Sequence, residues 1–541
     1  MIGLRHMTLV IVVMLMSLAS GCFDEGKDAA KQSAADSSEK LVPVRWEADE
    51  QPSRVYYEIF VRSFYDTNGD GIGDLNGVTE KLDYLQELGV EGIWLMPITA
   101  SPSYHGYDVT DYYAVNPDYG TLEDLRNLVA EAHKRDILVI ADLVVNHTSS
   151  EHPWFKEAIE SKDSPYRDWY TIKAAEETVP SDNAAGNGSP WHPHGSSKYL
   201  GIFWEGMPDL NFANEEVRQQ FVEIGKFWLS QGLDGFRLDA AKHIFGDFSS
   251  SQYSEAVVAD NQRWWQQFRS GLDEVNDGAY LVGEIWDSPT VVAPYLSNAF
   301  DSGFNFDLGE RIIAAARDER GADIAFTLKR IYSVFEKASN GQFVDAIFLT
   351  NHDQNRVMSL LGNNKQHAAM AASILLTLPG NPFLYYGEEI GMRGMKPDES
   401  IREPMPWMEA NDQAAGQTTW EEQRYNRDGG ESVEAMKHEQ DSLLNHYRML
   451  LQWRKEEQAL RNGSIDEFTI DNEKVGAYIR MDSRSRVLVV HNMSGSEQAV
   501  ELPSSDKYGA FDRIRFASQP DKTALHNGKL SLPPYSTAVL K

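Results

Sequence analysis

Cysteine is almost absent from this chain, and basic residues are scarce. Cys22 is the only cysteine among 541 residues, so no disulfide can form within the chain. Lysine and arginine number 50 against 82 aspartate and glutamate residues, which gives a formal net charge of −32. This charge disfavours nucleic acid and anionic membrane surfaces as partners, because both would repel the protein. A neutral polymer would not be repelled.

The apolar run near the N-terminus is too short for a permanent transmembrane helix. It extends from Leu9 to Leu18 and follows Arg5, as in a signal peptide. The next four residues, Ala19–Cys22, resemble the lipobox of bacterial lipoproteins, which implies that Cys22 becomes the lipidated first residue. Phe23, rather than Asp, follows this cysteine, and by resemblance to enterobacterial lipoprotein sorting this favours the outer membrane. We expect an exported protein, lipid-anchored to the bacterial cell envelope or, with an ordinary cleaved signal, secreted.

After this segment the chain changes from aperiodic to alternating. Residues 23–50 are rich in Ala, Ser, Asp, Glu and Lys, which predicts a flexible tether. Apolar strand-like segments then alternate with amphipathic stretches such as Thr121–Arg135 and Glu215–Gln231, as βα units require. Eight such strands would close a parallel barrel. They are Val55–Phe60, Gly92–Pro97, Ile137–Val144, Gly235–Asp239, Tyr280–Ile285, Phe300–Phe306, Ala346–Leu349 and Pro382–Tyr386.

Two regions depart from this alternation. Residues 148–205 are rich in His, Pro, Gly, Ser, Asn and Trp, which predicts a subdomain inserted after the third strand. After a helix at Leu443–Lys455, short alternating runs predict a C-terminal antiparallel β-sandwich; they are Glu467–Ile470, Val475–Met481, Arg486–His491 and Ala499–Leu502. The predicted fold is α/β, a (β/α)8 TIM barrel with these two additions. The predicted bounds are 1–22 signal peptide, 23–50 tether, 51–147 and 206–457 barrel, 148–205 insertion and 458–541 C-terminal domain.

Three acidic residues stand where a predicted barrel strand ends. They are Asp239 in GFRLDAAKH, Glu284 in YLVGEIWD and Asp353 in IFLTNHDQNR. The C-terminal ends of barrel strands form the cleft in which catalytic groups collect. Cleavage of a glycosidic bond needs a pair of carboxyl groups, one of which donates a proton. The three residues therefore suggest glycosidic-bond chemistry.

Seven motifs, in order along nearly the whole mature chain, resemble glycoside hydrolase family 13, the α-amylase family. The four that hold the acidic and histidine residues are DLVVNH at Asp142–His147, GFRLDAAKH at Gly235–His243, GEIWD at Gly283–Asp287 and FLTNHD at Phe348–Asp353. The others are MPDLN at Met207–Asn211, GIWLMP at Gly92–Pro97 and GNPFLYYGEEIGM at Gly380–Met392. The resemblance implies a retaining α-glucoside hydrolase that acts on starch-like α-glucans and maltooligosaccharides. We expect it to act as a monomer.

The resemblance also implies a role for each acidic residue. Asp239 would be the nucleophile, Glu284 the general acid and base, and Asp353 the residue that grips the sugar hydroxyls. Arg237, two residues before Asp239 on the same strand, would point to the same face and hold Asp239 ionised. Crowding by two carboxylates would raise the pKa of Glu284.

Other residues within the motifs are expected to bind substrate. By resemblance, His147 and His352 hydrogen-bond the sugar, Tyr107 stacks under it beside His105, and Lys242 and His243 contact the sugar on the leaving-group side.

A separate loop, DTNGDGIGD, predicts a calcium site. Its ligands would be the side chains of Asp66, Asn68, Asp70 and Asp74 and the carbonyl of Ile72, because hard oxygens at this spacing suit Ca²⁺. A structural role is expected. A second calcium between barrel and insertion, held by Asn146, Asp209 and the His243 carbonyl, stays open, because related α-glucosidases keep the Asn and Asp without metal.

The mode of attack is also open. The MPDLN motif and the AAKH ending favour an endo-acting α-amylase on α-1,4-glucans, similar to bacterial enzymes intermediate between the oligo-1,6-glucosidase and neopullulanase groups. Asp108 and Arg402 match residues of exo-acting α-glucosidases, which makes hydrolysis of maltooligosaccharides from chain ends the alternative. A non-catalytic starch-binding lipoprotein is disfavoured, because all three carboxylates are present.

Overall fold

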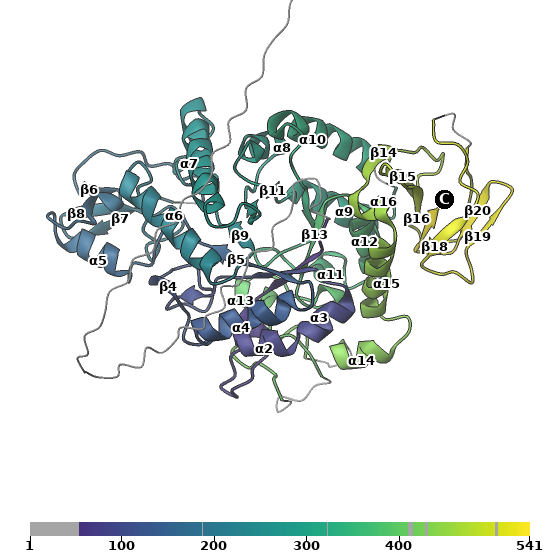
Figure 1. The fold of residues 1–541 in the computed structure, drawn as a ribbon, viewed down its shortest axis with the longest axis horizontal. Helices are drawn as coiled ribbons and strands as arrows, with labels where there is room; N and C mark the ends of the chain where they lie inside the picture. Colours follow the sequence, from purple (N-terminus) through teal and green to yellow (C-terminus); the bar gives the residue numbers. More distant parts are fainter. Residues whose placement is uncertain (1–52, 187, 322, 409–414, 428–430, 504–506) are drawn as a thin grey trace, which may run out of the picture. The chain divides into compact units, whose positions relative to one another are not determined.

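The computed structural model describes residues 53–186, 188–321, 323–408, 415–427, 431–503 and 507–541 (Figure 1). Cys22, the signal segment and the predicted tether lie outside these residues. Among the helices of the described part, none is long and apolar enough to cross a membrane.

Eight parallel strands form the barrel, as predicted. Their order around the sheet is β11-β10-β9-β5-β2-β1-β13-β12, and a parallel bridge between Phe304 and Ala346 joins the two ends. All eight lie inside or within one residue of the predicted segments. The strands are β1 (Tyr56–Ile59), β2 (Gly92–Leu95), β5 (Leu138–Leu143), β9 (Gly235–Leu238), β10 (Tyr280–Gly283), β11 (Ser302–Gly303), β12 (Ala346–Phe348) and β13 (Asn381–Tyr385).

Side chains on alternate positions of these strands separate two cores, because successive residues of a strand point to opposite faces. One set fills the barrel interior with large aromatic residues such as Tyr56, Trp94 and Phe383. Their neighbours, such as Tyr57 and Ile93, pack outward against the helices. The interior is therefore filled, and a cavity can open only at an end of the barrel.

Helices follow the strands around the barrel (Figure 1). The predicted helices are present as α4 (Leu122–His133), α6 (Glu215–Ser230) and α15 (Leu443–Glu456); Thr121 begins α4 with a capping box. The other long helices are α7 (Glu255–Asp273), α9 (Phe306–Asp318), α10 (Ile324–Ser339) and α12 (Lys365–Thr377). Shorter ones are α1 (Val61–Phe64), α2 (Leu75–Glu80), α3 (Leu82–Leu88), α8 (Pro289–Val292), η3 (Ala293–Leu296), α11 (Val357–Leu360), η4 (Glu388–Ile390), α13 (Asp398–Ile401), α14 (Val433–His438) and α16 (Gln458–Asn462).

Two excursions leave the barrel on the side that carries the cavity. The strands β3 (Thr99–Ala100) and β4 (Asp111–Val115) pair after β2 and hold the loop with Tyr107 between them. The region after β5 contains α5 (Pro153–Glu160), η2 (Arg167–Trp169) and a small antiparallel sheet in the order β6-β8-β7. Those strands are β6 (Ile172–Ala174), β7 (Trp191–His194) and β8 (Ser197–Leu200).

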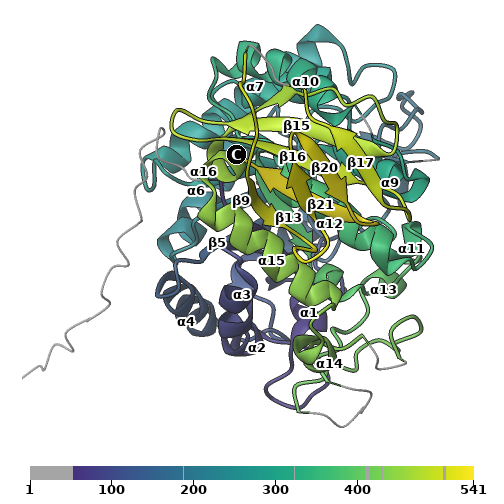
Figure 2. The ribbon, with the colours of Figure 1, turned by 90° about the vertical axis from the view of Figure 1, so that its right-hand side faces the viewer.

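The C-terminal domain consists of two antiparallel sheets whose inner faces share one core (Figure 2). One sheet has the order β14-β15-β16-β21-β18 and the other β17-β20-β19. Apolar residues of both, such as Ile479 and Leu488 of the first and Leu530 of the second, meet in that core. The strands are β14 (Ser464–Glu467), β15 (Val475–Met481), β16 (Arg486–Asn492), β17 (Gln498–Glu501), β18 (Ile514–Ala517), β19 (Ala524–His526), β20 (Lys529–Leu532) and β21 (Ser536–Leu540).

The position of the first of these strands differs from the expectation of Glu467–Ile470. Strand β14 ends at Glu467, which pairs with Tyr478 of β15. Phe468 and Ile470 pack against the domain core from the connection that follows, so their apolar character reflects burial outside a strand.

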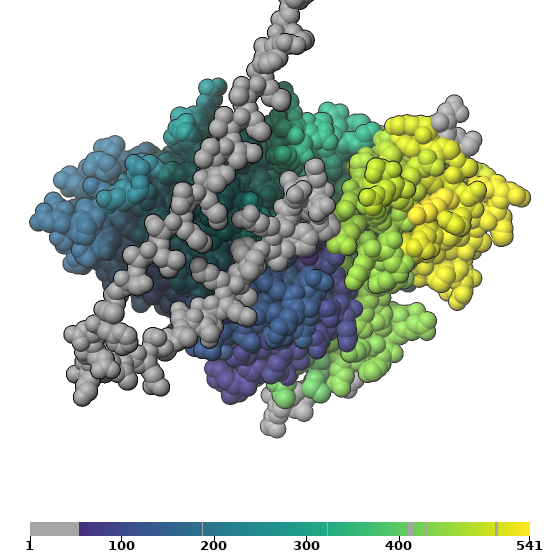
Figure 3. Space-filling model, in the orientation of Figure 1, coloured from purple at the N-terminus to yellow at the C-terminus, as the bar shows by residue number. Residues whose placement is uncertain are grey.

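Two buried arginines contact carbonyls near the end of helix α12, and one of them, Arg480, comes from the C-terminal domain. Arg480 on β15 donates to the carbonyls of Thr377, at 2.5 Å, and Gly463, at 2.7 Å. Arg454 on α15 donates to the carbonyl of Leu378 at 2.7 Å. Helix α12 ends at Thr377, so these guanidinium groups satisfy carbonyls that a helix end leaves without partners. In Figure 3 the surface of the C-terminal domain, in yellow, adjoins that of residues 443–462.

Candidate active site

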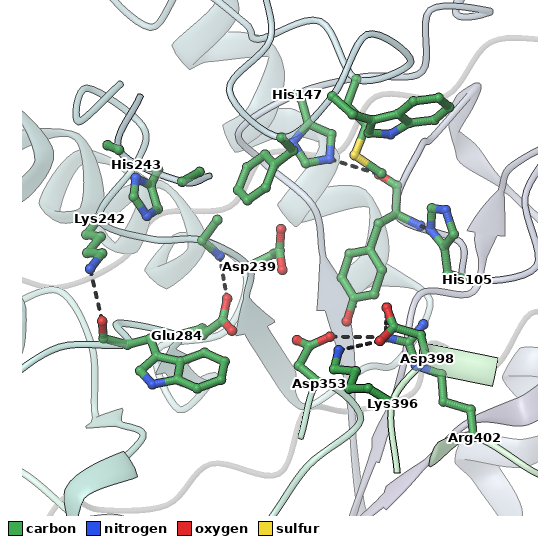
Figure 4. Close-up of a pocket in the computed structure, with 18 residues that line it drawn as sticks. His105, His147, Asp239, Lys242, His243, Glu284, Asp353, Lys396, Asp398 and Arg402 are labelled. Carbon is green, nitrogen blue, oxygen red and sulfur yellow. Dashed lines mark hydrogen bonds and ion pairs between the residues drawn. The ribbon is translucent and has the colours of Figure 1, made fainter. Parts of the chain in front are cut away.

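A cavity of about 720 Å³ opens at the C-terminal ends of the barrel strands (Figure 4). Its lining combines carboxylates, cations and aromatic rings, and it contains all three predicted acidic residues. The side chains that line it include His105, Tyr107, His147, Phe203, Trp204, Met207, Asp239, Lys242, His243, Glu284, Trp286, Asp353, Lys396, Asp398 and Arg402.

The parallel register of β9 and β10 places Asp239 beside Glu284. Leu238, the last residue of β9, pairs with Gly283, the last residue of β10, so the next residue of each strand falls at the same level. Asp239 is buried at this position, with only 8% of its surface exposed. Asp353 follows β12 and lies on the opposite side of the cavity in Figure 4. The structure thus brings three residues together that are far apart in sequence.

One guanidinium group holds two of these carboxylates and a third one beneath them. Arg237 Nη1 lies 2.5 Å from Asp239 Oδ1 and 2.9 Å from Asp142 Oδ1. Its Nη2 lies 3.0 Å from Glu284 Oε2. Burial lowers the pKa of Arg237, but the surrounding carboxylates outweigh it and raise that pKa well above its usual value. Arg237 therefore remains charged and holds the carboxylates of Asp239 and Glu284 close to its guanidinium group.

Burial acts against the ionisation of the three carboxylates that Arg237 contacts. Burial raises the pKa of Asp239, and Arg237 opposes this rise, which is the direction expected of a group that holds Asp239 ionised. Burial also raises the pKa of Glu284, with further contributions from Asp239 and Asp353, and it raises that of Asp142 to about 7. Asp239 has the shorter contact with Arg237, at 2.5 Å against 3.0 Å, which favours the proton on Glu284.

Asp353 lies in a different electrostatic environment. Burial acts to raise its pKa, but His352 and Arg402 outweigh burial and hold that pKa well below the usual range. His352 Nε2 lies 3.1 Å and Arg402 Nη2 3.0 Å from the carboxylate of Asp353. Asp353 is therefore an ionised acceptor that can hold sugar hydroxyls.

An aromatic wall adjoins Asp353. The ring of Tyr107 stacks on His352, with centroids 5.6 Å apart, and its hydroxyl donates to Asp142 Oδ2 at 3.0 Å. His147 Nε2 donates to the Tyr107 carbonyl at 3.1 Å, and burial lowers the pKa of His147 to about 4, so this imidazole is neutral. His105 lines the same wall.

The opposite wall carries Lys242 and His243. Lys242 Nζ donates to the carbonyl of Trp286 and to Asp287 Oδ2, both at 2.9 Å, so this cation is partly neutralised. Trp286 is 46% exposed and stacks on Phe306, with centroids 4.5 Å apart. The exposed ring offers an apolar surface on which a sugar ring can stack.

One predicted binding residue does not reach the cavity. Asp108 is 5% exposed and is absent from the cavity lining. Its carboxylate accepts hydrogen bonds from the hydroxyls of Ser101, at 2.7 Å, and Ser103. Arg402 does line the cavity, but it pairs with Asp353 and Asp398. Arg237 and His352 lie beneath the lining residues.

Residues 58–463 match the model of the alpha amylase catalytic domain. The chain belongs to the α-amylase family. Residues 475–539 of this family member also match the model of the alpha-amylase SusG C-terminal domain. Alpha-amylase 3 of Dictyoglomus thermophilum is 43% identical over 488 residues, which cover 90% of this chain and 93% of the relative. The oligo-1,6-glucosidase of Bacillus cereus is 32% identical, with 90% and 98% covered.

A solved relative supports the same assignment. The crystal structure of alpha-amylase from H. orenii superposes with a TM-score of 0.83 at 47% identity, and the match covers 90% of this chain and 99% of that one. The protein is thus an α-amylase-family hydrolase in fold and in sequence.

The α-amylase-family motifs did not reveal every residue that lines the cavity. Lys396 and Asp398, which pair with each other, come from the segment after β13, and Trp286 lies in the GEIWD motif, where the resemblance assigns it no role. An alternating strand pattern marks strand ends, whereas the shape of a connecting segment has no such signal. Of these three residues, only Trp286 could have been placed at the cavity from the sequence, because it follows Glu284 by two positions in the GEIWD motif.

The predicted calcium loop of this α-amylase-family chain is held by its own hydrogen bonds. Asp66 accepts from the backbone N–H groups of Asn68, Gly69 and Gly71, at 2.7 to 3.0 Å. Asp74 begins α2 by accepting from Gly77 N. No group of three His, Cys, Asp or Glu side chains in the described part has the arrangement of a metal site. The donor set still suits Ca²⁺, because it consists of hard oxygens and the described ion pairs supply no Lys or Arg to Asp66, Asp70 or Asp74.

The second candidate calcium site brings two of its predicted ligands together. Asn146 Nδ2 donates to Asp209 Oδ1 at 3.0 Å. Burial raises the pKa of Asp209 well above its usual value, and the nearby carboxylate of Asp247 raises it further. Neither Asp209 nor Asp247 has a basic partner among the described ion pairs, which fits a cation, but a proton shared between the two carboxylates balances the charge equally well.

Proposed function

We propose that the protein is a retaining, endo-acting α-amylase that cleaves α-1,4-glucosidic bonds of starch, glycogen and maltooligosaccharides. The observation that carries this proposal is the shared contact of Asp239 and Glu284 with Arg237 at the floor of the cavity. A retaining enzyme needs carboxyl groups about 5–5.5 Å apart, and one guanidinium that contacts both keeps them close.

In this mechanism Asp239 attacks the anomeric carbon while Glu284 donates its proton to the departing glycosidic oxygen. The C–O bond to the leaving chain breaks as the bond to Asp239 Oδ forms. Glu284, now ionised, then accepts a proton from the water that releases the sugar from Asp239. Because its pKa is raised, the carboxyl group of Glu284 can hold the proton that the first step needs.

The endo mode is supported by aromatic residues at the edge of the cavity. Phe203, Trp204 and Trp286 line it and remain 40%, 48% and 46% exposed, so they can stack on glucose units beyond the one that is cleaved. The position of Asp108, away from the cavity, weakens one of the two features that favoured chain-end attack.

The alternative is an exo-acting enzyme similar to α-glucosidases. The cluster of Arg402, Asp398 and Lys396 beside Asp353 favours it, since such a cluster could limit how much chain extends past the cleaved sugar. The similarity to an oligo-1,6-glucosidase is a second reason to keep it.

A timed product profile on soluble starch distinguishes the two modes. Endo attack predicts rapid loss of iodine staining with mixed oligosaccharides, whereas chain-end attack predicts glucose from the start with slow loss of staining. The variant Lys396→Ala is a useful second sample, because it opens the cluster of Lys396, Asp398 and Arg402. The products should become longer only if this cluster limits how much of the glucan chain enters the cavity.

The roles of the carboxyl groups are tested by Glu284→Gln. Loss of the proton donor should lower kcat by about 10²–10⁴-fold while oligosaccharide binding persists. Substantial residual hydrolysis would show that another group donates the proton.

We also propose that the loop with Asp66, Asn68, Asp70, Ile72 and Asp74 binds structural Ca²⁺. Added Ca²⁺ should then raise the melting temperature and a chelator should lower it. Asp70→Asn should reduce both responses, and a melting temperature that ignores both additions would remove the site. Retention of part of the Ca²⁺ response in that variant would point to the second site at Asn146, Asp209 and His243.

Finally, we propose that Cys22 carries a lipid that anchors the enzyme to the cell envelope, where it would act as a monomer on external α-glucans. Its basis is the signal-like segment before Cys22. Cys22→Ser should release the enzyme from the membrane fraction; an unchanged distribution would contradict the anchor.

A further inference from the structure

Glu58 is a buried glutamate that no motif singled out. It lies on β1, where it pairs with Trp94 of β2 and Tyr385 of β13, and it is 1% exposed. A carboxylate at such a position is costly unless a donor or a cation satisfies it. Its side chain must therefore serve a specific contact.

That contact is with His352, 294 residues away in the chain. Glu58 Oε1 lies 2.5 Å from His352 Nδ1, and both side chains are almost fully buried. The other ring nitrogen, Nε2, lies 3.1 Å from Asp353 Oδ2 and 2.6 Å from the Tyr107 hydroxyl. His352 thus stands between a carboxylate of the barrel core and two residues of the cavity wall.

The chemistry of these neighbours decides the charge of His352. A neutral imidazole has one N–H, whereas an imidazolium has two and can donate at both ends. Nδ1 faces a carboxylate, and Nε2 faces another carboxylate together with a phenol whose own proton goes to Asp142 at 3.0 Å. All three acceptors are satisfied only when both nitrogens carry protons.

The wider surroundings are mostly negative as well. The titratable and charged groups that face His352 are Glu58 on β1, Tyr107 after β3, Asp142 on β5, Asp239 after β9, Asp353 beside it and Arg402, whose Nε donates to the His352 carbonyl. Burial lowers the pKa of His352, but Asp353 and Glu58 outweigh it and raise that pKa to about 9.

We propose that Glu58 is a positioning residue that holds His352 as an imidazolium, so that His352 fixes Asp353 and Tyr107 against the sugar. The consequence for catalysis rests on the proposed hydrolytic function. The protonation of His352 does not, because it can be measured without substrate.

The direct test is nitrogen NMR of the protein labelled with ¹⁵N-histidine, with the His352 signals assigned through their loss in His352→Gln. In the unsubstituted protein at pH 8, His352 should show two protonated ring nitrogens. A neutral imidazole at pH 8 would overturn the proposal, even where no Glu58 variant folds.

The second test compares Glu58→Gln, which keeps size and hydrogen bonding but removes the charge, with Glu58→Asp, which keeps the charge. If the pKa of His352 falls to its ordinary value of about 6.5, its protonated fraction at pH 8 falls about 30-fold. We expect kcat/KM of Glu58→Gln on maltooligosaccharides to fall between pH 6 and pH 8 by up to this factor, mainly through KM. Glu58→Asp should retain part of the original profile.

Glu388→Gln is the matched control, since Glu388 is another buried glutamate that lies outside the cavity lining. It should leave the pH profile of kcat/KM unchanged. An unchanged profile and an imidazolium in Glu58→Gln would overturn the proposal. Full activity of Glu284→Gln would instead contradict the proposed hydrolytic mechanism and leave the NMR result standing.

Discussion

Buried arginines occur in two regions of the molecule and are used differently. Arg237, at the catalytic cavity, contacts three carboxylates. Arg480, at the junction with the C-terminal domain, contacts the carbonyls of Thr377 and Gly463 and has no carboxylate partner among the described ion pairs. Burial lowers the pKa of Arg480 to about 10, whereas the carboxylates around Arg237 raise its pKa.

The difference separates electrostatic from geometric use of one side chain. Arg237 balances charge, so its contribution depends on how many neighbouring carboxylates are ionised. Arg480 provides a planar set of donors for carbonyls that cannot titrate. Substitution of Arg237 should therefore affect the charge balance of the cavity, whereas substitution of Arg480 should affect the attachment of the C-terminal domain.

The largest expected effect follows from Arg237→Met. Loss of the cation should lower kcat by about 10²–10³-fold, because the charge that stabilises the reacting carboxylates is gone. It should also destabilise the fold by about 3–5 kcal/mol at neutral pH, since buried carboxylates lose their partner. Steady-state kinetics and urea unfolding measure the two effects.

The pH dependence of this loss sharpens the comparison. Without Arg237 the folded-state pKa values of Asp142, Asp239 and Glu284 rise further above their unfolded values. Stability from such groups is present at low pH and is lost as pH rises through the folded pKa. The destabilisation by Arg237→Met should therefore be greater at pH 8 than at pH 5, and equal losses would break the comparison.

A smaller effect is expected for Arg480→Met. Removing the donors leaves buried carbonyls unsatisfied, which costs about 1–3 kcal/mol for each group. The loss should be equal at pH 5 and pH 8, because carbonyls do not titrate in this range. Activity at temperatures where the variant is folded should match that of the parent; a reduced kcat would show that the junction influences the cavity.

The smallest effect concerns Glu388, a buried carboxylate that forms no ion pair among the described residues. Glu388 accepts from the Tyr447 hydroxyl at 2.8 Å, and burial raises its pKa to about 8, far above the unfolded value of about 4.3. Its contribution to stability is present below the unfolded pKa and is lost as pH rises towards 8. Glu388→Gln should flatten this decline in urea unfolding between pH 5 and pH 8. A slope equal to that of the parent would contradict the assignment.

The sequence predicted those parts of the site that sit at strand ends. Asp239, Glu284 and Asp353 could be placed in one cavity because the ends of parallel barrel strands meet at one face. The eight strands were recognisable because each is a short apolar run between amphipathic helices.

Other parts depend on contacts that a linear pattern does not contain. Whether Asp108 faces the cavity depends on the nearby hydroxyls of Ser101 and Ser103, which donate hydrogen bonds to its carboxylate and hold it away from the cavity. Alternation places Glu58 on the same face as Tyr56, but its contact with His352 exists only once β1 and β12 share a closed barrel. The roles of Lys396 and Asp398 depend on the fold of a connecting segment.

The closure of the barrel has a consequence for how activity is lost on heating. Among the described residues, β11 and β12 meet at one isolated bridge, between Phe304 and Ala346, whereas β2 and β5 pair along four residues. We call this junction between β11 and β12 the seam of the barrel. Local unfolding favours regions with few backbone hydrogen bonds, and the seam is such a region. Asp239 and Glu284 stand on one side of this seam and Asp353 on the other. Partial opening would separate Asp353 from Asp239 and Glu284, so inactivation should precede global unfolding.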